Sequence, residues 1–414
     1  MPIHNACRRV TTLSLTTLCS MLAALTVLVG PSAGAPDRAL ATVNVNTLPI
    51  ANGLPLDLGI SKGIFEKHGI EIKKTVLQSG NDIVLALANS NGDIGYIGWV
   101  PAFIADTAGI DIVTAAASEV EGTNVADNWQ NIIVKGSSSI RTPQDLAGKT
   151  IAVNALKGVG EVVIRAAFKK VGISQDSIRL VPIPFPSMRT ALANGQVDAI
   201  WTPEPFHSQA INQDGGRIVM APGPVVMPFL PNGMYAARRQ WATQNPAVYR
   251  NFRRALNEAL IYAQGHPDEI RALLPAATRD VRLPVWSPIL DRGKLLQLAR
   301  YAREFGVITR LPDMTQLVPG TISSGLILKG EVGATTISLR LDKQPVKTLE
   351  AGTDTFAIVD RSAKQNFHLK GPGVDRKTNL KKAGKATWTI TVRRGTYRFF
   401  SDANPKLKGS FRVG

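Results

Sequence analysis

The fold is indicated by two stretches that resemble each other, ALANSNGDIGYIGWVPAF at residues 86–103 and ALANGQVDAIWTPEPF at residues 191–206. Each begins as the end of an amphipathic helix, turns where Asn and Gly accept a left-handed conformation, and continues as a short apolar strand. A loop that begins with a tryptophan is expected after each strand, at Trp99 and at Trp201. The repetition predicts two half-domains of similar design.

The pattern around these stretches is that of an α/β protein. Strands that alternate with helices favour a parallel sheet covered by helices on both faces. Beyond Ile218 the pattern becomes helical, and a helix is also expected to begin at Thr142-Pro143. The further strands are predicted at residues 42–46, 70–76, 110–117, 131–135, 150–154 and 179–183, and the further helices at 56–65, 162–171, 246–264, 268–274 and 291–305.

The two tryptophans suggest where a ligand binds. In open α/β sheets, ligands bind beyond the carboxyl ends of the strands, and Trp99 and Trp201 would lie there. Either indole alone is equally well explained as part of a hydrophobic core. Two indoles at matched positions favour a cleft shared by the two half-domains.

The first 35 residues are typical of an export signal. Arg8 and Arg9 precede an apolar run at residues 18–30, and Ala33-Gly34-Ala35 supplies a small-residue cleavage pattern, so the mature chain is expected to begin near Pro36. Both cysteines, Cys7 and Cys19, fall inside this segment, which excludes disulfide and thiol chemistry from the mature protein. Cys19 lacks the small preceding residue expected at a lipid-attachment site, which favours a soluble exported protein, periplasmic or secreted.

In the last part of the chain, the apolar residues recur at every second position instead of at helical spacing. From about residue 322, short segments alternate apolar and polar residues between Gly-rich turns, which predicts a small all-β sandwich over residues 319–414. Residues 331–414 contain 17 Lys and Arg residues against 7 Asp and Glu residues, within a chain of net charge +17. A basic domain of this kind either binds an anionic surface or presents a solvated face without a partner. Nucleic acid is not expected as a partner, because the basic residues are not interleaved with surface aromatic residues.

Several motifs resemble those of a known family. The segments LGISKGIFEKHGIEI, SGNDIVLALANSNGDIGYIG, TPQDLAGKTIAV and ALANGQVDAIWTPEPF are similar to periplasmic solute-binding proteins of ABC importers, of the branch for nitrate, sulfonate, taurine and thiamine precursors. For residues 36–318 the resemblance implies a two-lobed, type II (flytrap) periplasmic-binding-protein fold that closes on a small-molecule solute. It also implies a monomer that delivers the solute to the permease and ATPase subunits of a transporter, without a cofactor.

One loop departs from the family pattern and bears on the solute. Relatives often carry Ser or Thr after the strand at 150–154, where a helix N-terminus holds an anionic group, whereas residues 155–160 have no hydroxyl side chain here. Backbone donors and Lys157 remain available for an anion. Two tryptophans with two nearby glutamates instead suit a flat or cationic organic solute, although Glu204 next to Pro205 is also explained as shaping the loop. The expected ligand-binding residues are Asn52, Ser79, Gly80, Trp99, Glu119, Asn154, Trp201 and Glu204.

The C-terminal domain resembles a second fold. DRSAKQNFHLKGPGV and GTYRFFSDANPKLKGSFRV are similar to cupredoxins, in which copper is held by two His, a Cys and a Met. The matching positions here are Gln365, Ser401, Asn404 and Leu407, so all four copper ligands are missing. The resemblance therefore implies a cupredoxin-like sandwich without a metal site.

A catalytic function has little support in the sequence. The four histidines after residue 35 are scattered, and no zinc-protease, nucleophile-elbow or P-loop motif occurs. We therefore expect a binding protein with no catalytic residues. An alternative is a surface interaction or sensor protein whose basic sandwich docks an envelope partner, and a redox copper protein is a third hypothesis.

Overall fold

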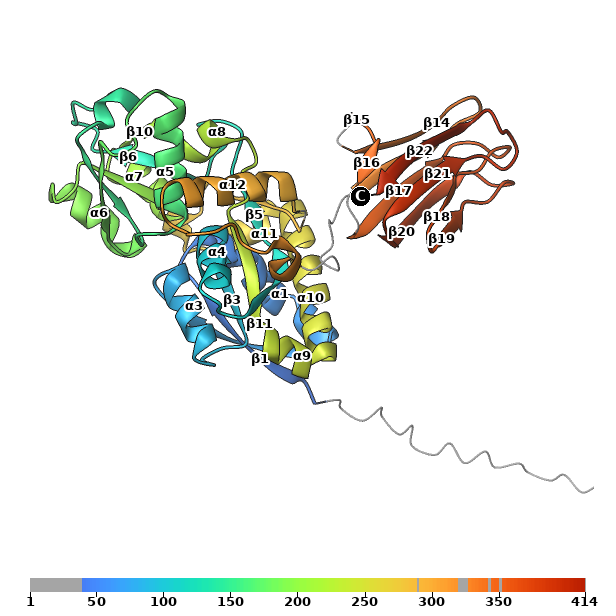
Figure 1. Cartoon of the computed structure of the whole chain (residues 1–414), viewed down its shortest axis with the longest axis horizontal. Coiled ribbons are helices and arrows are strands. Elements are labelled where there is room, and N and C mark those ends of the chain that lie inside the picture. The colour runs from blue at the N-terminus through green and yellow to red at the C-terminus, as the bar shows by residue number, and fades with distance from the viewer. Residues whose placement is uncertain (1–38, 289, 319–326, 342–343, 350–351, 414) are drawn as a thin grey trace, which may run out of the picture. The chain divides into compact units, whose positions relative to one another are not determined.

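The computed structural model describes residues 39–288, 290–318, 327–341, 344–349 and 352–413, which form two α/β lobes and a β-sandwich (Figure 1). The predicted export signal at residues 1–35 lies outside the described residues. The predicted start of the last domain, at residue 319, lies outside them as well. Within the described part of the chain, no helix has the length and apolar character needed to cross a membrane.

Lobe 1 is built on a five-stranded sheet in the order β2-β1-β3-β11-β4. β1 is parallel to β2 and β3, whereas β11 is antiparallel to both β3 and β4. The sheet is therefore mixed and not parallel throughout, because β11 returns from the other lobe. The strands are β1 (Ala41–Thr47), β2 (Ile70–Val76), β3 (Ile94–Gly98), β4 (Ile112–Ala117) and β11 (Gly233–Arg238), and the first helices are α1 (Leu54–Ser61), α2 (Ile64–Lys67), α3 (Gly80–Ala88) and α4 (Trp99–Thr107).

Lobe 2 repeats this arrangement in the order β10-β6-β9-β7-β8. β7 is parallel to β8 and β9, and β6 is antiparallel to β9 and β10, so this sheet is mixed as well. The strands are β6 (Gln130–Val134), β7 (Thr150–Val153), β8 (Arg179–Pro182), β9 (Ala199–Pro203) and β10 (Arg217–Met220), and the helices are α5 (Val159–Lys170), α6 (Phe185–Ala193), α7 (Phe206–Asn212) and α8 (Pro222–Val226). The helix expected at Thr142-Pro143 is only a 3-10 turn, η2 (Pro143–Leu146).

The region beyond Ile218 is not wholly helical as predicted, since it contains part of β10 and all of β11. β11 has the sequence GMYAAR, and its first five residues are all buried. A strand buried on both faces shows no alternation of apolar and polar residues, so its period cannot identify it.

The helices of this region follow the prediction more closely. α10 begins after Asn245 and ends at Gly265, and it contacts α1, α2 and β4 of lobe 1. α12 contacts α4 of lobe 1 and α5 of lobe 2. The helices are α9 (Arg239–Gln244), α10 (Pro246–Gly265), α11 (Pro267–Ala272), α12 (Arg292–Glu304) and α13 (Met314–Leu317), with short 3-10 turns η1 (Ala51–Gly53) and η3 (Ala276–Thr278).

The two repeated stretches differ after their strands. Trp99 is not in a loop but is the first residue of α4, whereas Trp201 lies inside β9. Pro203 and Pro205 delay the next helix of the second stretch until Phe206, because proline favours extended backbone before it and cannot donate to a helix. Similar sequences thus place their indoles in different environments.

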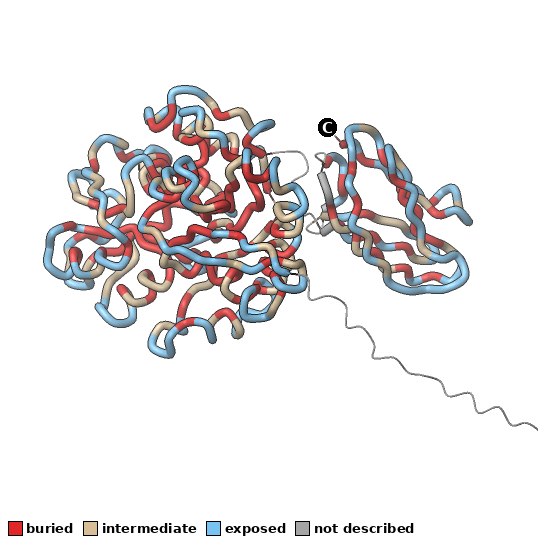
Figure 2. The backbone as a smooth tube through the Cα atoms, turned by 90° about the horizontal axis from the view of Figure 1, so that it is seen from below, coloured by how far each residue is buried: buried red, intermediate tan, exposed pale blue. Residues whose placement is uncertain are grey.

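The chain passes from lobe 1 to lobe 2 through residues 118–121 and returns through residues 230–233, and we call these two stretches the crossing segments. They run side by side, since Glu121 N donates to Leu230 O at 2.9 Å and Asn232 N donates to Glu119 O at 3.1 Å. β5 (Glu119–Val120) also pairs with β12 (Val285–Trp286). A continuous hydrophobic core runs through both lobes, and buried residues lie in their interior while exposed residues lie mainly at the periphery (Figure 2).

The C-terminal domain is a β-sandwich of two five-stranded sheets. The sheet orders are β15-β14-β13-β17-β20 and β16-β22-β21-β18-β19, and side chains of both, such as Phe356 and Tyr397, meet in one core. The short alternating strands predicted for this part of the chain are present among the described residues. The ten strands are β13 (Ile327–Val332), β14 (Ile337–Leu341), β15 (Gln344–Pro345), β16 (Thr348–Leu349), β17 (Gly352–Asp360), β18 (His368–Gly371), β19 (Val374–Lys377), β20 (Gly384–Val392), β21 (Gly395–Phe400) and β22 (Lys408–Val413).

Candidate functional site: a cavity between the lobes

A cavity of about 40 Å³ lies between the two lobes. This is room for about three water molecules, so the site is small. Its lining comes from both lobes and from the crossing segments. The lining residues are Leu48, Ile50, Asn52, Gly80, Asn81, Tyr96, Gly98, Pro101, Gln130, Asn154, Ala155, Gly158, Val159, Phe185, Trp201, Pro203 and Asn232.

Two helices direct their N-termini at the cavity. Gly80 and Asn81 begin α3 of lobe 1, and Gly158 and Val159 form the start of α5 of lobe 2. The first backbone N–H groups of a helix have no partner within the helix, so each terminus offers donors to a ligand. Ser79 does not line the cavity, because its hydroxyl caps α3 by accepting from Asp82 N at 3.1 Å.

A buried glutamate of the first crossing segment holds two of the lining side chains. Glu119 Oε1 accepts hydrogen bonds from Asn52 Nδ2, at 2.9 Å, and from Tyr96 Oη. Glu119 is only 2% exposed, and burial raises the pKa of its carboxyl group. Glu119 itself lies behind the lining, so it positions Asn52 and Tyr96 rather than contacting the cavity.

A second buried glutamate, Glu121, holds two further side chains of the cavity lining. Glu121 Oε1 accepts from Asn232 Nδ2 at 2.9 Å and from Gln130 Nε2. Glu121 is fully buried, and burial raises its pKa to about 7. The carboxyl group therefore changes its ionisation near neutral pH while it remains bonded to two amides of the cavity lining.

Several polar atoms at the site are buried without a partner among the described residues. They include Asn52 Oδ1 and Trp201 Nε1, which belong to lining residues, and Glu119 Oε2 and Glu121 Oε2 behind them. A buried polar group without a hydrogen bond costs about 1–3 kcal/mol.

The Trp201 indole forms the aromatic wall of the cavity with Phe185, and the two ring centres are 6.3 Å apart. The indole packs against the first turn of α5, where a Cβ at Gly160 would lie 2.7 Å from Trp201 Cε3. Only glycine allows this close approach. The prediction that Trp201 lies at a site shared by both lobes is consistent with this placement.

The lobes meet directly beside the cavity. Asn81 Nδ2 of lobe 1 donates to Leu156 O of lobe 2 at 3.2 Å. Gly98 packs so closely on Val159 that a Cβ at position 98 would overlap the valine side chain. The structure therefore shows the two lobes in contact around the site.

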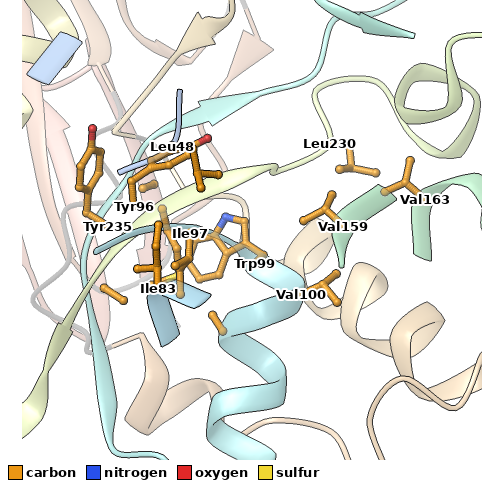
Figure 3. Close-up of a cluster of buried hydrophobic side chains, with 14 of the residues drawn as sticks. Leu48, Ile83, Tyr96, Ile97, Trp99, Val100, Val159, Val163, Leu230 and Tyr235 are labelled. Atoms are coloured by element: carbon orange, nitrogen blue, oxygen red, sulfur yellow. The ribbon is translucent and has the colours of Figure 1, made fainter. Parts of the chain in front are cut away.

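Trp99 is placed elsewhere than expected. Its side chain is fully buried, lies 6.4 Å from the Phe103 ring between centres, and is absent from the cavity lining. Figure 3 shows the indole within the hydrophobic cluster, beside Ile97. Because it begins a helix, the indole packs into the core, and the matched pair of ligand-facing indoles does not form.

Glu204 is also away from the cavity lining, in a buried polar network. Its carboxylate accepts from His207 Nδ1 at 3.0 Å, from Ser208 Oγ at 2.7 Å and from Arg282 N at 2.9 Å. His207 Nε2 is 2.9 Å from Asn131 Nδ2, which makes His207 an acceptor at Nε2 and a donor at Nδ1. This placement matches the interpretation of Glu204 as a residue that shapes the loop.

The structure thus brings four of the expected site residues to the cavity lining: Asn52, Gly80, Asn154 and Trp201. The lining residues that sequence reasoning missed include Tyr96, Gln130, Phe185 and Asn232. Phe185 follows a strand end, which is a signal that could have identified it. Gln130 begins β6 after the first crossing segment and Asn232 belongs to the second, and only the topology reveals this placement.

Comparisons with known proteins agree with this architecture. A putative binding protein of Brucella abortus is 25% identical over 214 residues, covering 50% of this chain and 62% of the relative. A putative aliphatic sulfonates-binding protein of Bacillus subtilis is 29% identical over 221 residues, covering 52% of this chain and 64% of the relative. The chain therefore spans less than two thirds of the length of these relatives.

A solved structure gives the same fold. The alkanesulfonate-binding protein SsuA from Xanthomonas axonopodis pv. citri, bound to MOPS, matches with a TM-score of 0.55 at 21% identity, covering 66% of this chain and 95% of that chain. The two lobes thus have a periplasmic-binding-protein fold, as the resemblance implied. A model of the NMT1-like family matches residues 37–276, which is more than half of the chain, and the protein therefore belongs to the NMT1-like family.

Proposed function

We propose that this protein is the solute-binding component of an ABC importer, which captures a small organic solute between its lobes and delivers it to a permease. The observation that carries the proposal is the cavity between the lobes, which is lined by residues of both lobes and receives the N-termini of α3 and α5. A small enclosed site of this kind, between two lobes, is typical of ligand binding.

The chemistry of the lining favours capture over catalysis. Among the described residues that line the cavity there is no Ser, Thr, Cys, His, Lys, Arg, Asp or Glu. Nucleophilic and general acid–base catalysis use these side chains. The only ionisable group in the lining is Tyr96, whose pKa is raised well above its usual value by burial and by Glu119.

The names of the relatives support a transport role. The relative from Bacillus subtilis is a putative aliphatic sulfonates-binding protein, and the bicarbonate-binding protein CmpA of Synechococcus is 25% identical over 236 residues. We infer partners of the corresponding kind for this chain, namely the permease and ATPase subunits of an importer, which it meets as a monomer. Export through the signal at residues 1–35 follows from the same role, and the mass of the purified mature protein tests it by locating the N-terminus near Pro36.

Binding is tested by thermal shift against a library of small sulfonates, carboxylates, amines and pyrimidines, followed by calorimetric titration of the compounds that raise the melting temperature. A ligand at a hundred times its dissociation constant stabilises the folded state by about 2.7 kcal/mol. Trp201→Ala should weaken each such compound at least about tenfold, as expected when an aromatic wall of the cavity is lost. Trp241→Ala is the control, because Trp241 packs on Tyr249 and does not line the cavity. Equal losses in the two variants, or no hit in the library, would count against the proposal.

For the C-terminal domain we propose a cupredoxin-like fold without copper. The proposal is supported by the proximity of the four positions matched to copper ligands. Ser401 Oγ donates to Gln365 Oε1 at 2.7 Å, Ser401 N donates to Leu407 O at 3.0 Å, and Leu407 N donates to Asn404 O at 3.0 Å. These side chains provide no thiolate, imidazole or thioether for copper.

The test restores the missing ligands together, as Gln365→His, Ser401→Cys, Asn404→His and Leu407→Met. Adding Cu(II) to this variant should produce an intense visible thiolate band, whereas the native chain should give none. A native chain that gives the band, or a four-fold variant that binds Cu(II) without it, contradicts the assignment. Docking of the basic sandwich to an envelope partner stays a prediction.

A further inference from the structure

One sheet of the C-terminal sandwich carries a cluster of positive side chains on its outer surface. This is the sheet β16-β22-β21-β18-β19 (Figure 1). Its residues Leu369, Tyr397 and Phe411 are buried in the core, and the residues that alternate with them along the strands face outward. The outward cations are all exposed, and we call them together the basic face: Lys370, Lys377, Arg398, Lys408 and Arg412.

The register of the strands brings these cations together around Arg398. Lys370 of β18 lies directly opposite Arg398 of β21, and Ser410 of β22 lies opposite Arg398 on its other side. Lys408 and Arg412 flank Ser410 on β22, which makes them the diagonal neighbours of Arg398, at about 7–8 Å. Like charges at such positions destabilise a sheet. The stability of the sandwich therefore does not explain the cluster.

The acidic side chains beside the basic face are already bonded to other cations. Asp375 lies 2.8 Å from His368 Nε2 and 3.5 Å from Lys370 Nζ, and Asp402 lies 2.7 Å from His368 Nδ1 and 3.5 Å from Lys377 Nζ. The remaining three cations of the face have no ion pair or side-chain hydrogen bond with another described residue: Arg398, Lys408 and Arg412. These three neighbouring charges are thus available to an anionic partner.

The outer surface of the other sheet has a different arrangement of charge. Its exposed cations among the described residues are Lys329, Arg340 and Lys385. Arg340 lies opposite Lys329 but interacts with another group, and β17 separates Lys329 of β13 from Lys385 of β20. Glu331, on the same surface, is paired with Arg361. Charge that serves only solubility is best interspersed, whereas the unpaired cations of the basic face are gathered on one side.

The shape of the basic face favours a lipid surface over a linear polyanion. Its three unpaired cations lie on two neighbouring strands and spread in two dimensions, as the headgroups of a bilayer do. The side chains between them, Thr396 and Ser410, are short and polar, so the longer Lys and Arg side chains extend beyond them. A single-stranded nucleic acid would need exposed aromatic rings for stacking. Phe400 of this surface is half-buried and packs on the His368 ring, with 4.5 Å between ring centres.

We propose that the basic face docks the C-terminal sandwich onto an anionic lipid bilayer, with Arg398, Lys408 and Arg412 against the headgroup phosphates. The attraction is electrostatic, so it depends on the anionic lipid content and weakens as salt screens the charges. The inference goes beyond the proposed function, because it concerns the C-terminal domain and holds whatever solute the lobes bind.

The experiment measures sedimentation of the full mature chain with lipid vesicles. One set of vesicles is phosphatidylcholine with about 30% phosphatidylglycerol, and the other is phosphatidylcholine alone. The protein should sediment with the anionic vesicles at about 0.1 M salt, and the bound fraction should fall steeply at about 0.5 M salt. Equal binding to both kinds of vesicle, or binding that salt does not weaken, overturns the proposal.

The assignment to this face is tested by a pair of charge-matched variants. Arg398→Gln together with Lys408→Gln should weaken binding about thirtyfold, since each Lys or Arg near an anionic surface contributes about fivefold. Lys329→Gln together with Lys385→Gln is the control, because it removes the same charge from the other sheet. The two sheets are about 10 Å apart, more than the Debye length of about 8 Å at physiological salt, so this control should lose less than about threefold. Equal losses in the two variants refute the assignment.

A third variant and a soluble probe complete the test. Arg412→Gln alone should weaken binding about fivefold, and it decides the question if the double variant of the basic face does not fold, as judged by circular dichroism. Unchanged binding in the folded variants of the basic face overturns the proposal. Absence of binding to the anionic vesicles also overturns it, and binding of poly-glutamate in their place would assign the face to an acidic protein.

Discussion

Replacing Glu121 by glutamine should remove a pH-dependent penalty on the stability of the lobes. In the native chain the carboxyl group is fully buried, and burial raises its pKa to about 7 from an ordinary value of 4.5. Glutamine has nearly the same shape, and its side-chain oxygen can still accept from Gln130 and Asn232. The substitution therefore removes the ionisation and little else.

The direction in which stability changes with pH follows from proton binding. Between pH 4.5 and about pH 7 the folded state holds a proton that the unfolded state has lost, so stability falls as the pH rises through this range. The cost is absent below the unfolded pKa and complete above the folded pKa, where a raised pKa of this size corresponds to roughly 3 kcal/mol. The Glu121→Gln variant should lack this loss, so its advantage over the native chain should grow by roughly that amount from pH 4.5 to pH 8.

Urea unfolding followed by tryptophan fluorescence measures the effect. Five of the six tryptophans lie between residues 99 and 286, so the signal reports mainly on the lobes. Both proteins are unfolded at a series of pH values from 4.5 to 8, and the difference in free energy of unfolding is plotted against pH. A difference that stays constant over this range would refute the assignment of the raised pKa to Glu121.

Three further perturbations follow from the packing. Trp99→Ala should lower the free energy of unfolding of the lobes by about 3–5 kcal/mol, measured by urea unfolding, because it leaves a cavity in a closed core; a loss below about 1 kcal/mol would contradict this. Gly98→Val should place a side chain where Val159 lies, hold the lobes apart and weaken solute binding by about a hundredfold in titration, and unchanged affinity would contradict the closure. Ser79→Ala should cost about 1 kcal/mol in the same unfolding assay through the lost cap of α3, whereas an unaltered stability would show that the cap contributes nothing.

Much of the fold could be predicted because its signals are local. α10 begins after Asn245 and ends at Gly265, and both boundaries can be recognised from a few adjacent residues. β11 could not be found in this way, because it pairs with β3 and β4, which lie more than a hundred residues earlier in the chain. The first five residues of β11 are all buried, so its sequence lacks the alternation of apolar and polar residues that would have revealed a strand.

The candidate site was predicted in part for the same reason. Trp201 and Asn154 lie at or near the ends of strands, and strand ends can be located from local sequence. Trp99 occupies the corresponding position in the first stretch, but a helix begins there, and helix geometry directs its indole into the core. The roles of Glu119 and Glu121 depend on which residues the crossing segments meet, and that information is not local.

The position of β11 between β3 and β4 has a consequence for synthesis of the chain. All strands of the lobe 2 sheet lie between Gln130 and Met220, ahead of β11 at Gly233–Arg238. As the polypeptide leaves the ribosome, the lobe 2 sheet can be completed while the lobe 1 sheet still has a gap at its fourth position. The lobe 1 sheet therefore cannot be completed until residues 233–238 have emerged, after every strand of the lobe 2 sheet.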